Sequence, residues 1–63
     1  MREALFEKHL EEGYIIGKAL AEKPDGTVVV VSHGISKTTT DEVWRYTFDE
    51  CVSALEANGW VRA

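Results

Sequence analysis

The sequence has one cysteine, few basic residues and no long apolar run, and each shortage excludes a class of protein. Cys51 alone cannot form a disulfide within the chain, which excludes the framework typical of small secreted domains. The longest purely aliphatic run is Val28 to Val31, whereas a membrane-spanning helix needs about 20 apolar residues. No apolar signal segment opens the chain. We therefore expect a soluble, cytoplasmic protein in a reducing compartment.

Basic residues are outnumbered. Seven Lys and Arg residues stand against eleven Asp and Glu, and the formal net charge is −4. The seven bases are scattered singly along the sequence, whereas binding to the phosphate backbone needs clustered Lys and Arg. Nucleic acid is therefore an unfavoured partner, and we do not expect the protein to bind a membrane.

Length sets a further limit. A chain of 63 residues fits one domain, residues 1–63, and buries only about 60% of its unfolded surface. Without disulfides, such a domain depends on regular packing or on association with a partner.

The first segment, residues 3–12, has the pattern of a short amphipathic helix. Leu5, Phe6, His9 and Leu10 have spacings of one, three and four residues, which would form one apolar stripe. Gly13 follows as the expected helix end.

A hairpin is predicted next, with strands at residues 14–22 and 27–33. The turn Lys23-Pro24-Asp25-Gly26-Thr27 has proline where φ is preset and glycine where a left-handed residue is needed. The expected pairs are Glu22–Val28, Leu20–Val30, Lys18–Ser32, Ala21–Val29, Ala19–Val31 and Gly17–His33. Because small residues let a helix approach closely, we expect the face with Ala19, Ala21 and the odd-numbered valines to be the core.

The remaining segments are a polar connection, a strand and a helix. Residues 33–42 form the connection, part of which could extend the flanking strands, and Val43 to Thr47 alternate as a third strand. Thr47 and Glu50 form a capping box that begins the second helix. Asn58-Gly59 ends it, and Trp60 is placed for a Schellman contact.

The expected fold is α+β, with the order α-β-β-β-α and a three-stranded antiparallel meander carrying two helices on one face. This order resembles the double-stranded RNA-binding domain in topology. That resemblance implies a nucleic-acid-binding module, but the family's lysine cluster at the start of its second helix corresponds here to Asp49 and Glu50.

Catalytic and metal motifs are incomplete. Gly34, Lys37 and Thr38 lack the second glycine of a phosphate-binding loop and the helix after it. His9, His33 and Cys51 have no metal-ligand spacing. The acidic pairs Asp41-Glu42 and Asp49-Glu50 would need a cleft for acid–base work. We expect no enzyme, no cofactor and no metal.

Two surfaces remain as candidate binding sites. One is an acidic ridge on the first helix. The other is the sheet face left uncovered by the helices, whose apolar side chains would form a patch that monomers seldom expose. Trp44 and Tyr46 belong to this face unless they point toward the helices and Val43, Arg45 and Thr47 point outward, and the alternation fits both arrangements. The predicted partner-binding residues are Glu3, Glu7, Glu11, Glu12, Tyr14, Ile16, Leu20, Val28, Val30, Trp44 and Tyr46.

These surfaces predict a small acidic protein–protein interaction module, binding another protein or itself as a homodimer. One version is a phage-type inhibitor, of the anti-CRISPR kind, that docks on a basic surface of a bacterial defence or nucleic-acid-handling complex. One alternative is a homo-oligomeric small-molecule binder or enzyme with a subunit-interface site near residues 33–40, lined by His33, Ser36, Lys37 and the threonines that follow. The other is nucleic-acid binding through Lys37 and Arg45.

Overall fold

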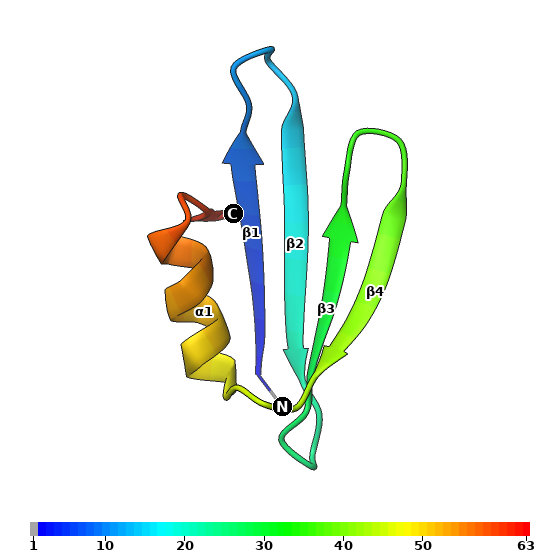
Figure 1. The fold of residues 1–63 in the computed structure, drawn as a ribbon, viewed down its shortest axis with the longest axis vertical. Helices are drawn as coiled ribbons and strands as arrows, with labels where there is room; N and C mark the ends of the chain where they lie inside the picture. Colours follow the sequence, from blue (N-terminus) through cyan, green and yellow to red (C-terminus); the bar gives the residue numbers. More distant parts are fainter. Residues whose placement is uncertain (1) are drawn as a thin grey trace.

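Residues 2–63, the part of the chain described by a computed structural model, form a five-stranded antiparallel sheet with one helix (Figure 1). The elements are β1 (Glu3–His9), β2 (Ile15–Glu22), β3 (Val28–His33), β4 (Thr38–Val43), α1 (Phe48–Ala57) and β5 (Val61–Arg62). The strand order is β4-β3-β2-β1-β5. The fold is mostly β, so the predicted three-stranded meander with two helices, and with it the topology of the double-stranded RNA-binding domain, is wrong.

The hairpin of β2 and β3 has the predicted register. All six expected pairs form, from Glu22–Val28 to Gly17–His33. In the turn, the Lys23 amide donates to the Thr27 carbonyl at 2.8 Å and the Gly26 amide donates to the Lys23 carbonyl at 2.9 Å. Gly26 has a φ of +90°, a value that residues with a Cβ rarely adopt. The predicted turn chemistry is confirmed.

The first segment is a strand, not the predicted helix. β1 pairs with β2 along its whole length, from Glu3–Ala21 to His9–Ile15. The turn between them repeats the hydrogen bonds of the second turn, since Leu10 donates to Tyr14 at 2.8 Å and Gly13 donates to Leu10 at 2.9 Å. Gly13, with a φ of +93°, therefore closes a hairpin rather than a helix.

Residues 3–9 form a strand because β2 needs a second pairing partner. Its backbone has two edges, and β3 occupies one of them. A strand at the centre of a sheet needs partners for the amides and carbonyls of both edges. Pairing with β1 supplies the second set, which outweighs the weak helix preference of the Glu-, Ala- and Leu-containing first segment.

The strand predicted at residues 43–47 is also displaced. β4 is the threonine-rich segment Thr38–Val43, which pairs with β3 from His33–Thr38 to Val28–Val43. The Gly34 amide donates to the Lys37 carbonyl at 2.8 Å and closes this third hairpin. Trp44 to Tyr46 instead form the connection to α1. β2 occupies one edge of β3, and the chain that follows the third hairpin turn pairs with the other edge as β4. Threonine favours β-strands.

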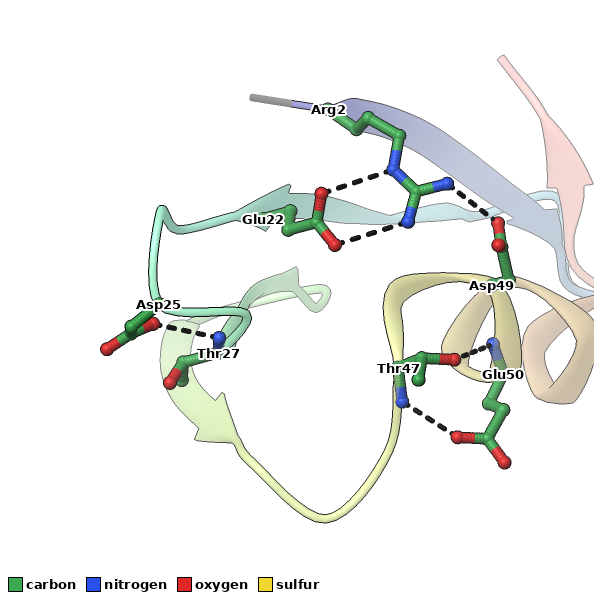
Figure 2. A network of polar contacts seen from close by, with 7 residues as sticks. All are labelled: Arg2, Glu22, Asp25, Thr27, Thr47, Asp49 and Glu50. Carbon is green, nitrogen blue, oxygen red and sulfur yellow. Dashed lines mark hydrogen bonds and ion pairs between the residues drawn. The ribbon is translucent and has the colours of Figure 1, made fainter.

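Helix α1 begins and ends at the predicted residues. The Thr47 hydroxyl accepts from the Glu50 amide at 3.1 Å, and the Glu50 carboxylate accepts from the Thr47 amide at 2.8 Å (Figure 2). At the other end, Gly59 donates to the Glu56 carbonyl at 3.1 Å and Trp60 donates to the Leu55 carbonyl at 3.0 Å. These two bonds are those of a Schellman motif, so both predicted ends are confirmed.

The core lies between α1 and one face of the sheet, which we call the helix side. Residues opposite one another in neighbouring strands share a face, and Ala4, Leu20 and Phe6 belong to this one. Leu20 is 2% exposed and Val28 is fully buried. The buried cluster consists of Ala4, Phe6, Leu20, Val28, Phe48 and Val52.

This burial is the reverse of the predicted one. The face with Ala19, Ala21, Val29 and Val31 was expected to be the core, yet the helix covers the opposite face. The larger side chains, Leu20 and the even-numbered valines, remove more apolar surface from water than alanines do. The register pairs Leu20 with Val30 whichever face of the sheet is covered. The register alone therefore could not predict which face the helix covers.

The two edges of the sheet differ. β5 pairs with β1 at Phe6–Arg62 and Glu7–Val61, and the Ala63 amide donates to the Leu5 carbonyl at 3.0 Å. At the other edge, β4 pairs with β3 only.

Within residues 2–63 we find no helix whose length and apolarity would let it cross a membrane.

Candidate functional site

The face of the sheet away from α1, which we call the open side, is apolar at its centre. Register places these residues on it: Leu5 from β1, Ile15, Gly17, Ala19 and Ala21 from β2, Val29 and Val31 from β3, and Val61 from β5. Leu5 and Ile15 are each 59% exposed. No element of the described chain covers this face, and exposed apolar patches of this kind commonly mark interaction sites.

Small side chains make the middle of the open side concave. Gly17 and Ala19 of the central strand lie between Leu5 on one neighbour and His33 on the other, and Ile15 lies at the end. Together they line an open-side hollow of about 380 Å³. A protruding apolar side chain of a partner would fit into such a depression.

Acidic side chains border the open side. Glu3 and Glu7 flank Leu5 on β1, and Glu42 lies at the β4 edge. Lys23 pairs with Glu42 at 3.3 Å, and His9 Nε2 lies 3.2 Å from Glu7. The strand lysines and arginine, Lys8, Lys18 and Arg62, lie on the other face, whereas His9 and His33 lie on the open side. The open side is therefore an apolar surface with two carboxylates on β1 and one at the β4 edge.

The predicted acidic ridge survives in a different form. Glu3 and Glu7 were expected on a helix; they lie on the open side of β1, because residues four apart in a strand also share a face. Glu11 and Glu12 lie in the exposed turn that follows. The four carboxylates thus follow one strand and its turn.

The predicted apolar half of the site lies on the wrong face. Ile16, Leu20, Val28 and Val30 are on the helix side, and Leu20 and Val28 belong to the core. Tyr14 is exposed beside the first turn. Trp44, 74% exposed, and Tyr46 protrude from the connection before α1 rather than from a strand. The residues of the open side that the sequence did not identify as a site are Leu5, Ile15 and the small residues of β2. The available signal was the alternate spacing of Ile15, Gly17, Ala19 and Ala21, which places them on one face of a strand.

The loop at residues 34–37 is an exposed hairpin end. Its neighbour His33 lies 3.0 Å from the Thr38 hydroxyl through Nδ1, across the last pair of the ladder. His33 lines the open-side hollow, whose lining does not include Ser36 or Lys37. Residues 2–63 also contain no group of three or more His, Cys, Asp or Glu that could hold a metal ion.

A larger hollow lies on the helix side, where α1 leaves part of the sheet uncovered. Figure 1 shows α1 along the β1 border of the sheet, with β3 and β4 extending beyond it. This helix-side hollow has a volume of about 560 Å³. Its lining comes from the sheet, the connection and the helix: Lys18, Leu20, Val30, Val43, Tyr46, Glu50, Cys51, Ala54 and Leu55.

Two lysines from the neighbouring strands β1 and β2 meet at the ring of Trp60, and one of them, Lys18, lines this hollow. Lys8 Nζ donates to the Asn58 carbonyl at the end of α1 at 3.0 Å and lies 5.9 Å from the Trp60 ring centre. Lys18 Nζ lies 5.4 Å from the same ring and donates to Ser32 Oγ at 2.7 Å. Positive charge at a helix C-terminus complements the helix dipole. Two strands thus supply the bases that the last turn of α1 lacks.

Cys51 lies in the wall of the helix-side hollow. Burial, followed by the negative charge of Glu50, raises the pKa of its thiol. A raised pKa keeps the sulfur protonated at neutral pH and makes it a poor nucleophile. Its contribution is that of a small apolar side chain.

Comparison with protein-family models, with curated proteins and with solved structures finds no match for this chain. The geometry of the open side and of the helix-side hollow is therefore the basis for assigning a function.

Proposed function

We propose that the protein is an interaction module, acting by binding rather than by catalysis, whose open side docks on a basic surface of another protein. The observation that carries the proposal is the uncovered apolar face, with Leu5 and Ile15 exposed and Glu3 and Glu7 beside them. Apolar burial would supply affinity, and the carboxylates would select a partner with lysines or arginines around its own apolar patch.

The same charges disfavour a second copy on this face. Two open sides packed with their β1 strands facing each other would bring Glu3 and Glu7 near the same residues of the other copy, and the strand lysines and arginine lie on the opposite face. Like charges brought together at an interface oppose binding. The homodimer expected from the sequence is thus the less favoured occupant.

A pair of model peptides tests the proposal. One is an amphipathic helical peptide with a leucine stripe flanked by lysines, and the other has glutamates in place of the lysines. We expect the lysine peptide to shift the backbone amide NMR signals of Leu5, Ala19 and Val31, with affinity that falls as salt is added. The glutamate peptide should bind weakly or not at all.

Charge variants supply the control. Glu3→Lys with Glu7→Lys should reverse the preference between the peptides, whereas Glu11→Lys with Glu12→Lys, the same change of charge in the turn, should leave it unaltered. If neither peptide shifts open-side signals, or if the turn variant acts like the strand variant, the proposal is wrong. Concentration-dependent sedimentation abolished by Leu5→Asp would instead identify a second copy as the occupant.

The inhibitor expected from the sequence is a narrower form of this proposal. It requires that the basic surface covered by the open side is one that a partner uses to bind nucleic acid. A partner recovered through the open side should then lose affinity for nucleic acid when this chain is added, and regain it with the Glu3→Lys, Glu7→Lys variant.

A further inference from the structure

The helix-side hollow is a second, chemically different site. Its floor is formed by Leu20, Val30 and Val43 of three neighbouring strands, and its wall by Cys51 and Leu55 of α1. A ten-residue helix is only about 15 Å long and covers part of one sheet face. The volume of about 560 Å³ falls in the range of roughly 300–1,000 Å³ found for small-molecule sites.

Lys18 supplies the positive charge of this hollow. Its ammonium is half-buried, donates to Ser32 Oγ at 2.7 Å and faces the Trp60 ring. The ion pairs formed among residues 2–63 do not include it. A hydroxyl and an aromatic face only partly replace the water lost on burial, so an anion placed beside Lys18 would be bound in a site with reduced solvent screening.

The acidic group of the hollow is already engaged. Glu50 lies at the helix N-terminus, and its carboxylate accepts the Thr47 amide at 2.8 Å in the capping box (Figure 2). It is therefore less available to a cationic ligand than Lys18 is to an anionic one. The hollow thus combines apolar walls with one available cation.

We propose that the helix-side hollow binds a small amphiphilic carboxylate. The alkyl or aryl body lies between the strand residues Leu20 and Val30 and the helix residues Cys51 and Leu55, and the carboxylate accepts a hydrogen bond from Lys18 Nζ. This site is on the opposite face from the open side, so it does not depend on the proposed docking function.

Three probes that share a ten-carbon chain and differ in head group test the proposal: decanoate, 1-decanol and decyltrimethylammonium. Titrated into the isotope-labelled full chain, decanoate should shift the amide signals of Leu20, Val30, Cys51 and Ala54. It should bind more tightly than decanol by about tenfold or more, the factor expected for a hydrogen bond to a charged group. The ammonium probe should bind most weakly.

Lys18→Met keeps the length of the side chain and removes its charge. It should weaken decanoate binding by about tenfold or more and leave decanol binding within a factor of two, which a merely unfolded variant could not do. Lys37→Met, in the exposed hairpin end, is the matched control and should bind all three probes like the original chain.

A second variant tests the cavity without touching the charge or the core. Ala54 is an exposed helix residue in the wall of the hollow, and Ala54→Phe should fill the space and abolish decanoate binding. The proposal is overturned if decanoate binds no more tightly than decanol, if its shifts lie on the open side, or if Lys18→Met and Lys37→Met weaken it equally.

Discussion

Arg2 and Asp49 meet at 2.9 Å, between Nη1 and Oδ1, although 47 positions separate them in the chain. The same guanidinium donates to both oxygens of Glu22 at 3.2 Å (Figure 2). It also lies 4.6 Å from the centre of the Phe48 ring. One side chain thus joins the residue before β1, the end of β2 and the first turn of α1. Shared contacts of this kind stabilise more than an isolated surface pair does.

The Arg2 contacts predict how stability depends on pH. The hydrogen bond from Arg2 lowers the pKa of Glu22 below its ordinary value of 4.5, and the Thr27 amide lowers the pKa of Asp25. A carboxylate with a depressed folded-state pKa stabilises the fold above its unfolded pKa, and this contribution is lost as the pH falls through the folded value. The free energy of unfolding should therefore be nearly constant from pH 7 to about 5 and fall below it.

Urea unfolding of Glu22→Gln tests whether the Arg2–Glu22 contact contributes to the loss of stability at acidic pH. The variant should be less stable than the original chain at pH 7, and the difference should shrink as the pH falls below about 5 and through the lowered folded-state pKa of Glu22. A difference that stays the same as the pH falls would show that the Arg2–Glu22 contact does not contribute to the acid sensitivity.

Two neighbouring valines whose side chains lie on opposite faces of the sheet test which face the helix covers. Val28 is fully buried on the helix side, and Val29, the next residue, belongs to the open side. Val28→Ala should lower the free energy of unfolding by about 2 kcal/mol, the combined effect of lost burial and a new cavity. Val29→Ala should cost less than about 1 kcal/mol. Chemical denaturation of both variants measures this, and equal losses would contradict the burial described.

The capping box predicts a specific loss at the start of α1. Thr47→Ala removes the acceptor of the Glu50 amide and should cost about 1 kcal/mol of stability. Thr47→Ser retains the hydroxyl and should cost little. Thr40→Ala, an exposed threonine of the β4 edge, controls for the loss of a threonine as such. A similar cost for Thr40→Ala and Thr47→Ala would exclude the cap as the cause.

Two glycines differ in what a side chain would cost. Gly13, with a φ of +93°, has no heavy atom within 4 Å of an added Cβ; the cost of Gly13→Ala is therefore backbone strain of about 1–2 kcal/mol. A Cβ on Gly17 would lie 3.6 Å from the Phe6 carbonyl, an ordinary contact. Gly17→Ala should then be neutral or stabilising in thermal unfolding. The reverse order would contradict the hairpin turn at Gly13.

The local features of the chain were predictable from its residues. The turn at Pro24 to Gly26, the register of β2 and β3, the capping box at Thr47 and the stop at Gly59 were all expected and all occur. Each depends on residues within a few positions of one another, where the backbone preferences of glycine, proline and capping residues act directly.

The first segment shows where local reasoning failed. The pattern Glu11-Glu12-Gly13 predicts a helix end, whereas its hydrogen bonds are those of the Pro24-Asp25-Gly26 turn. Glycine with a positive φ serves both a helix end and a hairpin, so Gly13 alone did not distinguish them. The decision came from the free edge of β2, which β1 pairs.

The sequence by itself therefore determined the turns, the helix ends and which residues lie opposite one another in the central hairpin. Only the tertiary structure decided that residues 3–9 are a strand, that α1 covers Leu20 rather than Ala19, and that Lys8 and Lys18 meet at Trp60. The physical reason is distance along the chain. Turns and caps act between near neighbours, whereas edge pairing, face coverage and charge clustering depend on segments that meet only in the folded protein.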